Sequence, residues 1–201
     1  MYKIAAFIEF DKRITNKILK QKKIVKKKFG NQIYLNHPVH LTLFTLNIKK
    51  INELKKIYIN NIKKKSKPLL VSLTKPGIFY NDPLTGGHTF FHYIKKNKRI
   101  GEIQLRHLKK INNKLFVYRK NKNLFKNNDL KKNYKKFGFP FAGNIWIPHT
   151  TVASIKNLKN DNTYIKKFLS EKIKLKCVIR EIKFYKIMKD KHDFLFNVKD
   201  F

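Results

Sequence analysis

The sequence predicts an α+β fold with two antiparallel sheets that meet at a central cleft and with helices on the outside. Three observations support this prediction. Strand-like apolar runs are interleaved with amphipathic helical segments, the last part of the chain reads as a hairpin, and no Pro/Gly/Ser-rich linker divides the 201 residues. We therefore expect one bilobal domain over residues 1–201.

The first half of the chain shows a strand, helix, strand, helix, strand order. Apolar spacing, lysine-rich opposite faces and turn residues define these elements. We expect a buried strand at Lys3–Phe10, a helix from Ile14 to Phe29 with Ile24 or Val25 in its apolar face and Gly30 at its end, a strand at Val39–Asn47, a helix from Ile51 to Ile62, a strand at Pro68–Thr74, and turns at Lys75–Gly77 and Asp82–Gly87.

The second half repeats this alternation and ends in strands. We expect a strand at His88–Lys95, a helix from Ile100 to Leu115, an exposed loop or helix end at Asn121–Lys136, a strand within Trp146–Ile155, a helix near Asp161–Glu171, and a long strand from Val178 to Ile187 that pairs with Phe194–Val198 across Asp190–Asp193.

The motif His-x-Thr occurs twice, each time inside a strand-like apolar run. His40-Leu41-Thr42 lies in Val39–Leu46, and His149-Thr150-Thr151 lies in Trp146–Ile155, whereas none of the other five histidines has Thr two positions later. Side chains alternate faces along a strand, so each motif presents one imidazole and one hydroxyl to the same side. Two imidazoles can supply a general base and a general acid in one turnover.

The residues around the two motifs also resemble each other. Pro38-Val39-His40-Leu41-Thr42 and Ile147-Pro148-His149-Thr150-Thr151 both run from a proline turn through His-x-Thr into apolar residues. The chain resembles the two-histidine (2H) phosphoesterase superfamily, in its RNA-ligase-like (LigT-like) branch. The resemblance implies a duplicated fold. It also implies a phosphodiesterase that cleaves 2′,3′-cyclic phosphate or 2′,5′-linked RNA, and the reverse of this reaction would ligate RNA.

The motif residues allow this chemistry without a metal or a cofactor. One of His40 and His149 would take a proton and the other would donate one to the leaving oxygen, while Thr42 and Thr151 would donate hydrogen bonds to the non-bridging phosphate oxygens. No metal-ligand spacing and no glycine-rich phosphate loop occurs in the sequence. The sequence leaves open which histidine is the base.

The composition points to an intracellular protein with an anionic partner. The formal net charge of +36 favours RNA, oligonucleotide or cyclic nucleotide substrates. The lysines are spread over nearly every segment, however, and the codon usage of an AT-rich genome would also produce such a composition. The single Cys177 excludes a disulfide framework and reads as a core residue. Because no run has the length of a signal peptide or a membrane span, we expect a cytoplasmic protein with no membrane contact. We also expect a monomer.

Other candidate residues have simpler structural interpretations. His37 could pair with His40 on a metal but is more typical of a surface loop, and His88 and His92 are more typical of core or edge positions. Four aromatic residues could stack on a nucleobase, although each alone is more typical of a core: Phe79, Tyr80, Phe141 and Trp146.

Three functions compete. The first is the phosphodiesterase described above, including a variant that degrades cyclic or 2′,5′-linked oligonucleotide immune messengers. The second is a basic RNA-binding module without turnover, which the presence of all four motif residues argues against, since binding alone would not require them. The third is a basic structural protein in which the motifs are coincidental.

Overall fold

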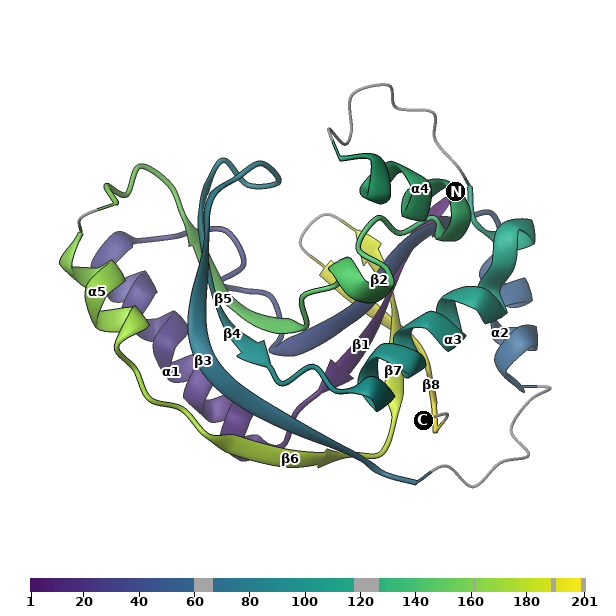
Figure 1. Ribbon diagram of the computed structural model, residues 1–201, viewed down its shortest axis with the longest axis horizontal. Coiled ribbons are helices and arrows are strands. Elements are labelled where there is room, and N and C mark those ends of the chain that lie inside the picture. The colour runs from purple at the N-terminus through teal and green to yellow at the C-terminus, as the bar shows by residue number, and fades with distance from the viewer. Residues whose placement is uncertain (60–66, 118–126, 161, 189–190, 200–201) are drawn as a thin grey trace.

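The computed structural model describes residues 1–59, 67–117, 127–160, 162–188 and 191–199. These residues form two four-stranded sheets in which every neighbouring pair of strands is antiparallel (Figure 1). Sheet A has the order β2 (His40–Ile48), β1 (Tyr2–Glu9), β7 (Ile182–Met188), β8 (Lys191–Val198), and sheet B has the order β5 (His149–Ile155), β4 (Gly87–Ile94), β3 (Leu69–Asp82), β6 (Leu175–Ile179). The α+β prediction is confirmed.

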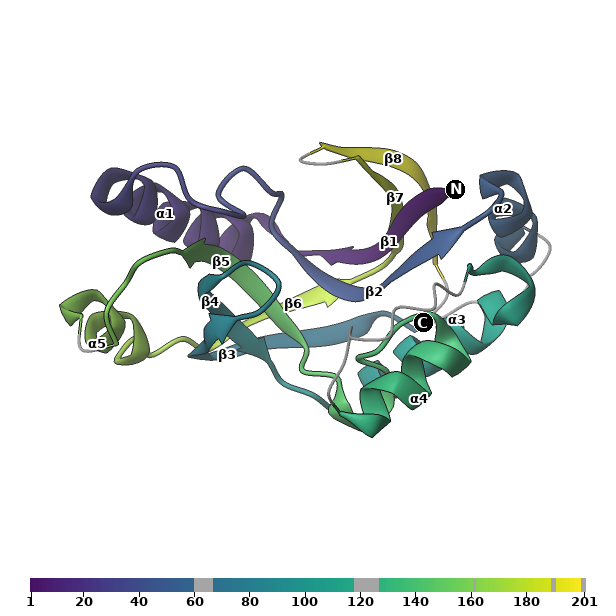
Figure 2. The ribbon, with the colours of Figure 1, turned by 90° about the horizontal axis from the view of Figure 1, so that it is seen from above.

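Two helices pack against the sheet to which their preceding strand does not belong. Helix α1 (Lys12–Phe29) follows β1 of sheet A, yet it contacts β5 and β6 of sheet B, where α5 (Thr163–Leu169) contacts β3. Conversely, α3 (Lys98–Leu115) follows β4 of sheet B but contacts β2 of sheet A and α2 (Ile51–Ile59). Figure 2 shows these two groups of helices at opposite ends of the molecule. The crossing of α1 and α3 to the opposite sheets holds the two sheets together.

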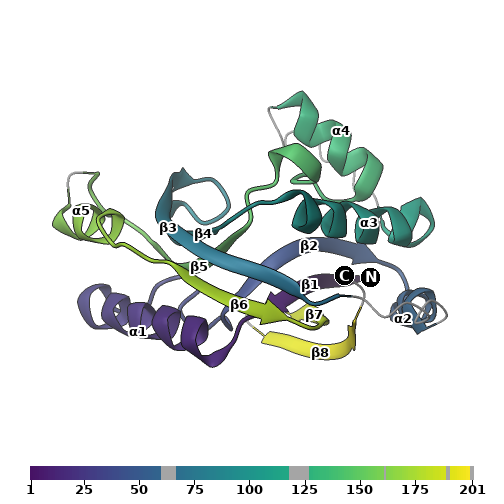
Figure 3. The ribbon, with the colours of Figure 1, turned by 60° about the horizontal axis from the view of Figure 1, so that its bottom comes forward.

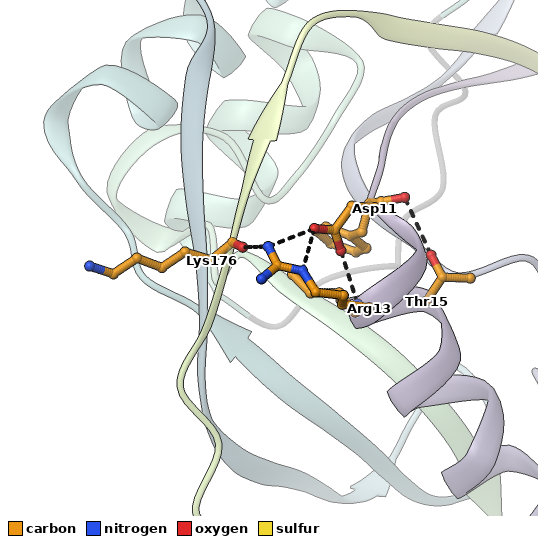
Figure 4. Close-up of polar contacts among 6 residues, drawn as sticks. Asp11, Arg13, Thr15 and Lys176 are labelled. Atoms are coloured by element: carbon orange, nitrogen blue, oxygen red, sulfur yellow. Dashed lines mark hydrogen bonds and ion pairs between the residues drawn. The ribbon is translucent and has the colours of Figure 1, made fainter.

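Helix α1 begins at a side-chain cap that also joins it to sheet B. The Asp11 carboxylate accepts a hydrogen bond from the backbone N–H of Ile14 (3.0 Å), as expected of an N-cap residue. The Arg13 guanidinium donates both to Asp11 and to the backbone carbonyl of Lys176 in β6 (2.8 Å) (Figure 4). Val25 is fully buried whereas Ile24 is 48% exposed, which places Val25 in the apolar face of the helix.

Three expectations about element boundaries are wrong. Strand β3 continues through the predicted turn at Lys75–Gly77, where the pairing with β4 shifts register instead of reversing the chain. The predicted long strand from Val178 to Ile187 is two strands: β6 pairs in sheet B and β7 in sheet A, and Figure 3 shows β6 leading into β7. Part of the expected loop at Asn121–Lys136 is helix α4 (Asn128–Phe137), while 121–126 lie outside the described residues.

The other elements agree with the sequence within a few residues. The predicted hairpin of the last two strands is confirmed as β7 and β8, although the residues 189–190 at its turn lie outside the described residues. Strand β5 begins at His149, not at Trp146, because the residues before it form the short 3₁₀ helix η1 (Gly143–Ile145) and an extended link. Cys177 is buried, as expected of a core residue.

Candidate active site

The two His-x-Thr motifs lie on the edge strands of the two sheets, and these strands contact each other. Strand β2 is the edge of sheet A and β5 is the edge of sheet B, each with its motif at its first residues. Contacts between β2 and β5 join the two sheets, which Figures 1 and 2 show from two sides. The fold therefore brings together two strands that start about a hundred residues apart in the chain.

Burial alternates along both motifs as the strand period requires. In β2, the half-buried His40 and Thr42 alternate with Leu41 and Leu43, which are buried. In β5, His149 and Thr151 are half-buried and Thr150 is fully buried between them. Each motif thus presents its imidazole and its second-position hydroxyl to one side of the sheet. Among the described residues, neither hydroxyl has a hydrogen-bond partner within the chain.

A β-bulge follows the motif threonine in both strands. In sheet A, Thr42 pairs with Phe7 and Phe44 pairs with Ala6, which leaves Leu43 as the extra residue. In sheet B, Thr151 pairs with Phe91 and Ala153 pairs with Phe90, which leaves Val152 as the extra residue. A bulge bends the strand locally and redirects the side chains next to it. The two halves therefore share this irregularity at the same position relative to the histidine.

A phenylalanine packs against each motif histidine from the neighbouring strand. Phe7, opposite Thr42, lies parallel to the His40 ring, with 3.7 Å between centroids and 19° between planes. Phe91, opposite Thr151, lies 5.0 Å from the His149 ring at 59°. Both phenylalanines are buried. Each imidazole is thus covered on one side by an apolar ring, which restricts its rotation and its contact with water.

Each motif histidine is also held by a backbone carbonyl two residues before it. His40 Nδ1 lies 2.8 Å from the carbonyl oxygen of Pro38, and His149 Nδ1 lies 2.7 Å from that of Ile147. A carbonyl oxygen only accepts, so Nδ1 must carry the proton and donate it. In the neutral ring the lone pair is then on Nε2. Among the described residues, no group forms a hydrogen bond with Nε2 of either histidine. Both Nε2 atoms are available to a ligand as bases.

The surroundings keep both imidazoles neutral. Burial is the largest effect on His40 and lowers its pKa to about 3. The hydrogen bond to the Pro38 carbonyl raises this pKa, whereas the positive charge of Lys22 lowers it. Burial also lowers the pKa of His149, opposed by the Ile147 carbonyl and by Asp82. Desolvation disfavours the charged form of a histidine. An anion placed next to either ring would oppose this shift, because a nearby negative charge favours the protonated imidazole.

Two further histidines gather next to His40. His192 of β8 lies 5.9 Å from His40 and 4.8 Å from His37 between ring centroids, and 5.4 Å from Phe7. Its pKa is lowered first by burial and then by the charges of His37, Lys22 and Lys3. His37 is typical of a surface loop in the sequence, and nothing there singles out His192, because the sequence predicts the hairpin of β7 and β8 but not its pairing with β1 in sheet A.

A carboxylate is held on the same face of sheet A. Glu9 pairs with His40 across β1 and β2, and its carboxylate accepts hydrogen bonds from Lys183 Nζ (2.7 Å) and from the Tyr185 hydroxyl. The hydrogen bond to Glu9 is the main cause that raises the pKa of Lys183. Both partners come from β7, the strand next to β1. Sequence spacing could not identify this cluster, because it depends on the register of two strands that are far apart in the chain.

Of the four aromatic residues considered for base stacking, one reaches a motif histidine. The Phe79 ring lies 5.3 Å from the His149 ring and stacks on Phe91 at 4.2 Å. Trp146 is 4% exposed and belongs to the core, Phe141 packs against Phe139, and Tyr80 packs against His88. His88 and His92 are buried, as expected of core residues.

The described residues contain neither a metal-binding cluster nor a membrane-spanning helix. Within them no group of three or more His, Cys, Asp or Glu side chains is placed to hold a metal ion. In the same part of the chain, no helix combines the length and the apolar character needed to cross a bilayer.

Comparisons with known proteins agree with this architecture. The family model of the AKAP7 2'5' RNA ligase-like domain matches residues 2–201. Among solved structures, TT0787 of Thermus thermophilus is similar with a TM-score of 0.64 at 12% identity, over 98% of this chain and 96% of that one. No curated protein sequence matches significantly.

Structures of E. coli LigT are similar over the whole length as well. The one complexed with NADP+ has a TM-score of 0.53 at 10% identity, and the one complexed with 3'-AMP has 0.54 at 10%; each covers 98% of this chain and 96% of LigT. At these identities the likeness shows the fold. The match of the family model to residues 2–201 shows that the chain belongs to the AKAP7 2'5' RNA ligase-like domain family, and its fold is LigT-like.

Proposed function

We propose that this protein is a metal-independent phosphodiesterase that cleaves 2′,3′-cyclic phosphate or 2′,5′ linkages in RNA or oligonucleotides, with His40 and His149 as acid and base. One observation carries the proposal. On two edge strands that contact each other, each histidine donates Nδ1–H to the carbonyl two residues before it and so keeps the lone pair on Nε2. We further propose that residues 1–201 act as one domain and as a monomer.

The cleavage requires two proton transfers at opposite sides of one phosphorus atom. For a 2′,3′-cyclic phosphate, one Nε2 takes a proton from water as the water oxygen attacks phosphorus. The bond from phosphorus to one ribose oxygen breaks, and the second imidazole, protonated at Nε2, gives its proton to that oxygen. One proton is taken up and one is released, so the pair of histidines returns to its starting charge with the roles exchanged.

The threonine hydroxyls would bind the phosphate during this step. Thr42 and Thr151 lie two residues after the histidines and on the same sides of their strands. Each hydroxyl can donate a hydrogen bond to a non-bridging oxygen, on which negative charge increases in the transition state. Donors that are already in place stabilise this charge without a cost of reorganisation.

The nucleotide chemistry of relatives supports the substrate class. LigT structures contain NADP+, 3'-AMP or phosphate, and the net charge of +36 favours polyanionic ligands. A second candidate function is degradation of cyclic or 2′,5′-linked oligonucleotide messengers, which uses the same site. A third is RNA binding without turnover.

The test is a panel of substrates incubated with the full chain in EDTA and analysed by product mass. The panel contains 2′,3′-cyclic mononucleotides, 2′,5′- and 3′,5′-linked oligonucleotides and cyclic dinucleotides. We expect the wild type to cleave the first or second class, and His40→Asn or His149→Asn to cleave it about a hundredfold or more slowly. Binding of RNA without any cleavage would favour the binding module, and strict dependence on an added divalent metal would contradict the mechanism.

A further inference from the structure

The backbone before each motif histidine forms the same turn in both halves of the chain. The residue six positions before the histidine has a left-handed backbone, with φ of 71° at Tyr34 and 69° at Gly143. Its carbonyl accepts a hydrogen bond from the N–H three positions before the histidine, from His37 in one half and from Trp146 in the other, each at 3.2 Å. The likeness of the two halves therefore extends upstream of His-x-Thr.

One lysine side chain closes each of these turns. Lys22 Nζ donates to the carbonyls of Tyr34 (2.6 Å) and His37 (2.8 Å), which are six and three positions before His40. Lys96 Nζ donates to the carbonyls of Gly143 (2.9 Å) and Trp146 (2.9 Å), which are six and three positions before His149. It also donates to the carbonyl of Asn144.

The two lysines have no other evident ionic role. Neither ammonium group forms an ion pair with a carboxylate in the part of the chain that the structure describes. Lys22 is 4% exposed, and burial lowers its pKa to about 8. A buried cation without a carboxylate is costly to retain, so its contacts with the turn need a reason. Lys96 is exposed, so the two lysines share their contacts with the carbonyls of the turn and not their burial.

The turns matter because they lead directly into the carbonyls that hold the imidazoles. Pro38 follows His37 and Ile147 follows Trp146, so each lysine fixes the peptide unit next to the carbonyl that accepts Nδ1–H. An ammonium group has several N–H donors. One lysine can therefore hydrogen-bond to several carbonyl oxygens at once and hold them together, with no backbone N–H needed as a donor. If the turn loosens, the carbonyl moves and the imidazole is free to rotate or to change tautomer.

We propose that Lys22 and Lys96 are positioning residues. Lys22 holds the turn that fixes the Nδ1–H tautomer and the orientation of His40, and Lys96 holds the turn that does the same for His149. The catalytic part of this inference rests on the proposed function. The structural part does not, because the tautomer of each imidazole can be read without substrate.

The first arm of the test reads the imidazoles in the full chain labelled with ¹⁵N-histidine. Two-bond ¹H–¹⁵N correlation spectra without substrate report the tautomer of each ring, and His40→Asn and His149→Asn assign the two signals. We expect both rings as Nδ1–H in the wild type. Lys22→Met should introduce the Nε2–H tautomer at His40 alone, and Lys96→Met at His149 alone. Lys23→Met and Lys95→Met, which remove exposed neighbouring lysines, should change neither.

The second arm measures turnover of the best substrate from the panel. We expect kcat to fall on the order of tenfold in Lys22→Met and Lys96→Met, with KM within about twofold, because a misplaced group costs rate more than binding. Lys22→Arg, which keeps the charge and can donate to two carbonyls, should restore part of kcat. If the buried Lys22→Met change prevents folding, the surface variant Lys96→Met still decides the question.

Unchanged imidazole tautomers in both methionine variants, or a change at both histidines from a single substitution, would overturn the inference. So would an unchanged kcat in both variants. A wild-type protein that cleaves nothing would contradict the proposed function instead, and the spectra would still decide whether the lysines hold the turns.

Discussion

The Phe7 ring lies flat against the His40 imidazole, with 3.7 Å between the ring centroids and 19° between the planes. Phe7 is 3% exposed and comes from β1, whereas His40 begins the neighbouring strand β2. The stacked ring keeps water from one face of the imidazole. Since burial is the first cause that lowers the pKa of His40 to about 3, this contact is part of that shift.

Replacing Phe7 should therefore change the titration of His40. In Phe7→Leu we expect the pKa of His40 to rise from about 3 towards the ordinary value of about 6.5, because water reaches the ring. An NMR titration measures it. Phe44→Leu is the matched control, since Phe44 is buried in β2 and packs on Phe184. A Phe7→Leu protein in which His40 titrates as in the wild type would contradict the assignment of the shift to burial under this ring.

The rate should depend on pH in a way that reflects both lowered pKa values. Catalysis needs one imidazole unprotonated and the other protonated, so kcat/KM should peak between the two pKa values of the free protein. Both lie below the ordinary 6.5, which predicts a peak below pH 6.5. Bound phosphate favours the imidazolium, so the peak of kcat should lie at higher pH than that of kcat/KM. Profiles of both constants from pH 4 to 9 test this, and a kcat/KM peak above pH 7 would be inconsistent with it.

The two threonines of β2 provide a comparison within one strand. Thr42→Ala removes a hydroxyl on the side of His40 and should lower kcat on the order of tenfold, less than loss of a histidine. Thr45 lies beyond the bulge at Leu43 on the same strand, and Thr45→Ala should leave kcat within about twofold of the wild type. Steady-state kinetics of both variants measure this difference. Equal losses in the two would indicate an effect on strand stability rather than on phosphate binding.

The buried His92 should make folding sensitive to acid. Its Nε2–H donates to Gln21 Oε1 (2.8 Å), its Nδ1 has no partner, and its pKa is lowered to about 4, mainly by burial. The unfolded chain takes up this proton near pH 6.5, before the folded chain does. Stability is therefore full above pH 6.5 and falls as the pH drops towards 4, by about 3 kcal/mol from this residue.

Urea unfolding of the wild type and of His92→Leu at pH 7 and pH 4.5 tests this linkage. The variant should lose less free energy of unfolding between the two pH values than the wild type does, whatever its stability at pH 7. Equal losses in both proteins would show that His92 is not responsible.

Much of this fold could be predicted from the sequence because its signals are local. Alternation around His40 and His149 identified the motif strands, and the spacing of Ile14, Ile18 and Val25 identified the face of α1. The break between β6 and β7 could not be predicted, because Arg180 and Glu181 lie between two apolar runs that read as one strand. Only the pairing of these runs with different sheets separates them.

The site was predicted as far as its residues are close in the chain. Each motif gave its histidine and its threonine, whereas the residues that surround them depend on registers between distant segments. Phe7 faces Thr42 through the pairing of β1 with β2, and His192 reaches His40 because the hairpin of β7 and β8 pairs with β1 through β7. The lysine contacts were hidden for another reason: in a chain with 48 Lys and Arg residues, neither Lys22 nor Lys96 stands out.

In the proposed reaction, His40 and His149 act together as the acid and the base of one phosphodiesterase step. The most direct measurement is kcat/KM in EDTA for His40→Asn, His149→Asn and the double variant on the same substrate. We expect each single variant to lose about a hundredfold or more and the double variant to be little worse than either, because removing one partner already disables the pair. Undiminished cleavage in either single variant, or losses that multiply in the double variant, would show that the two histidines do not act as one acid–base pair.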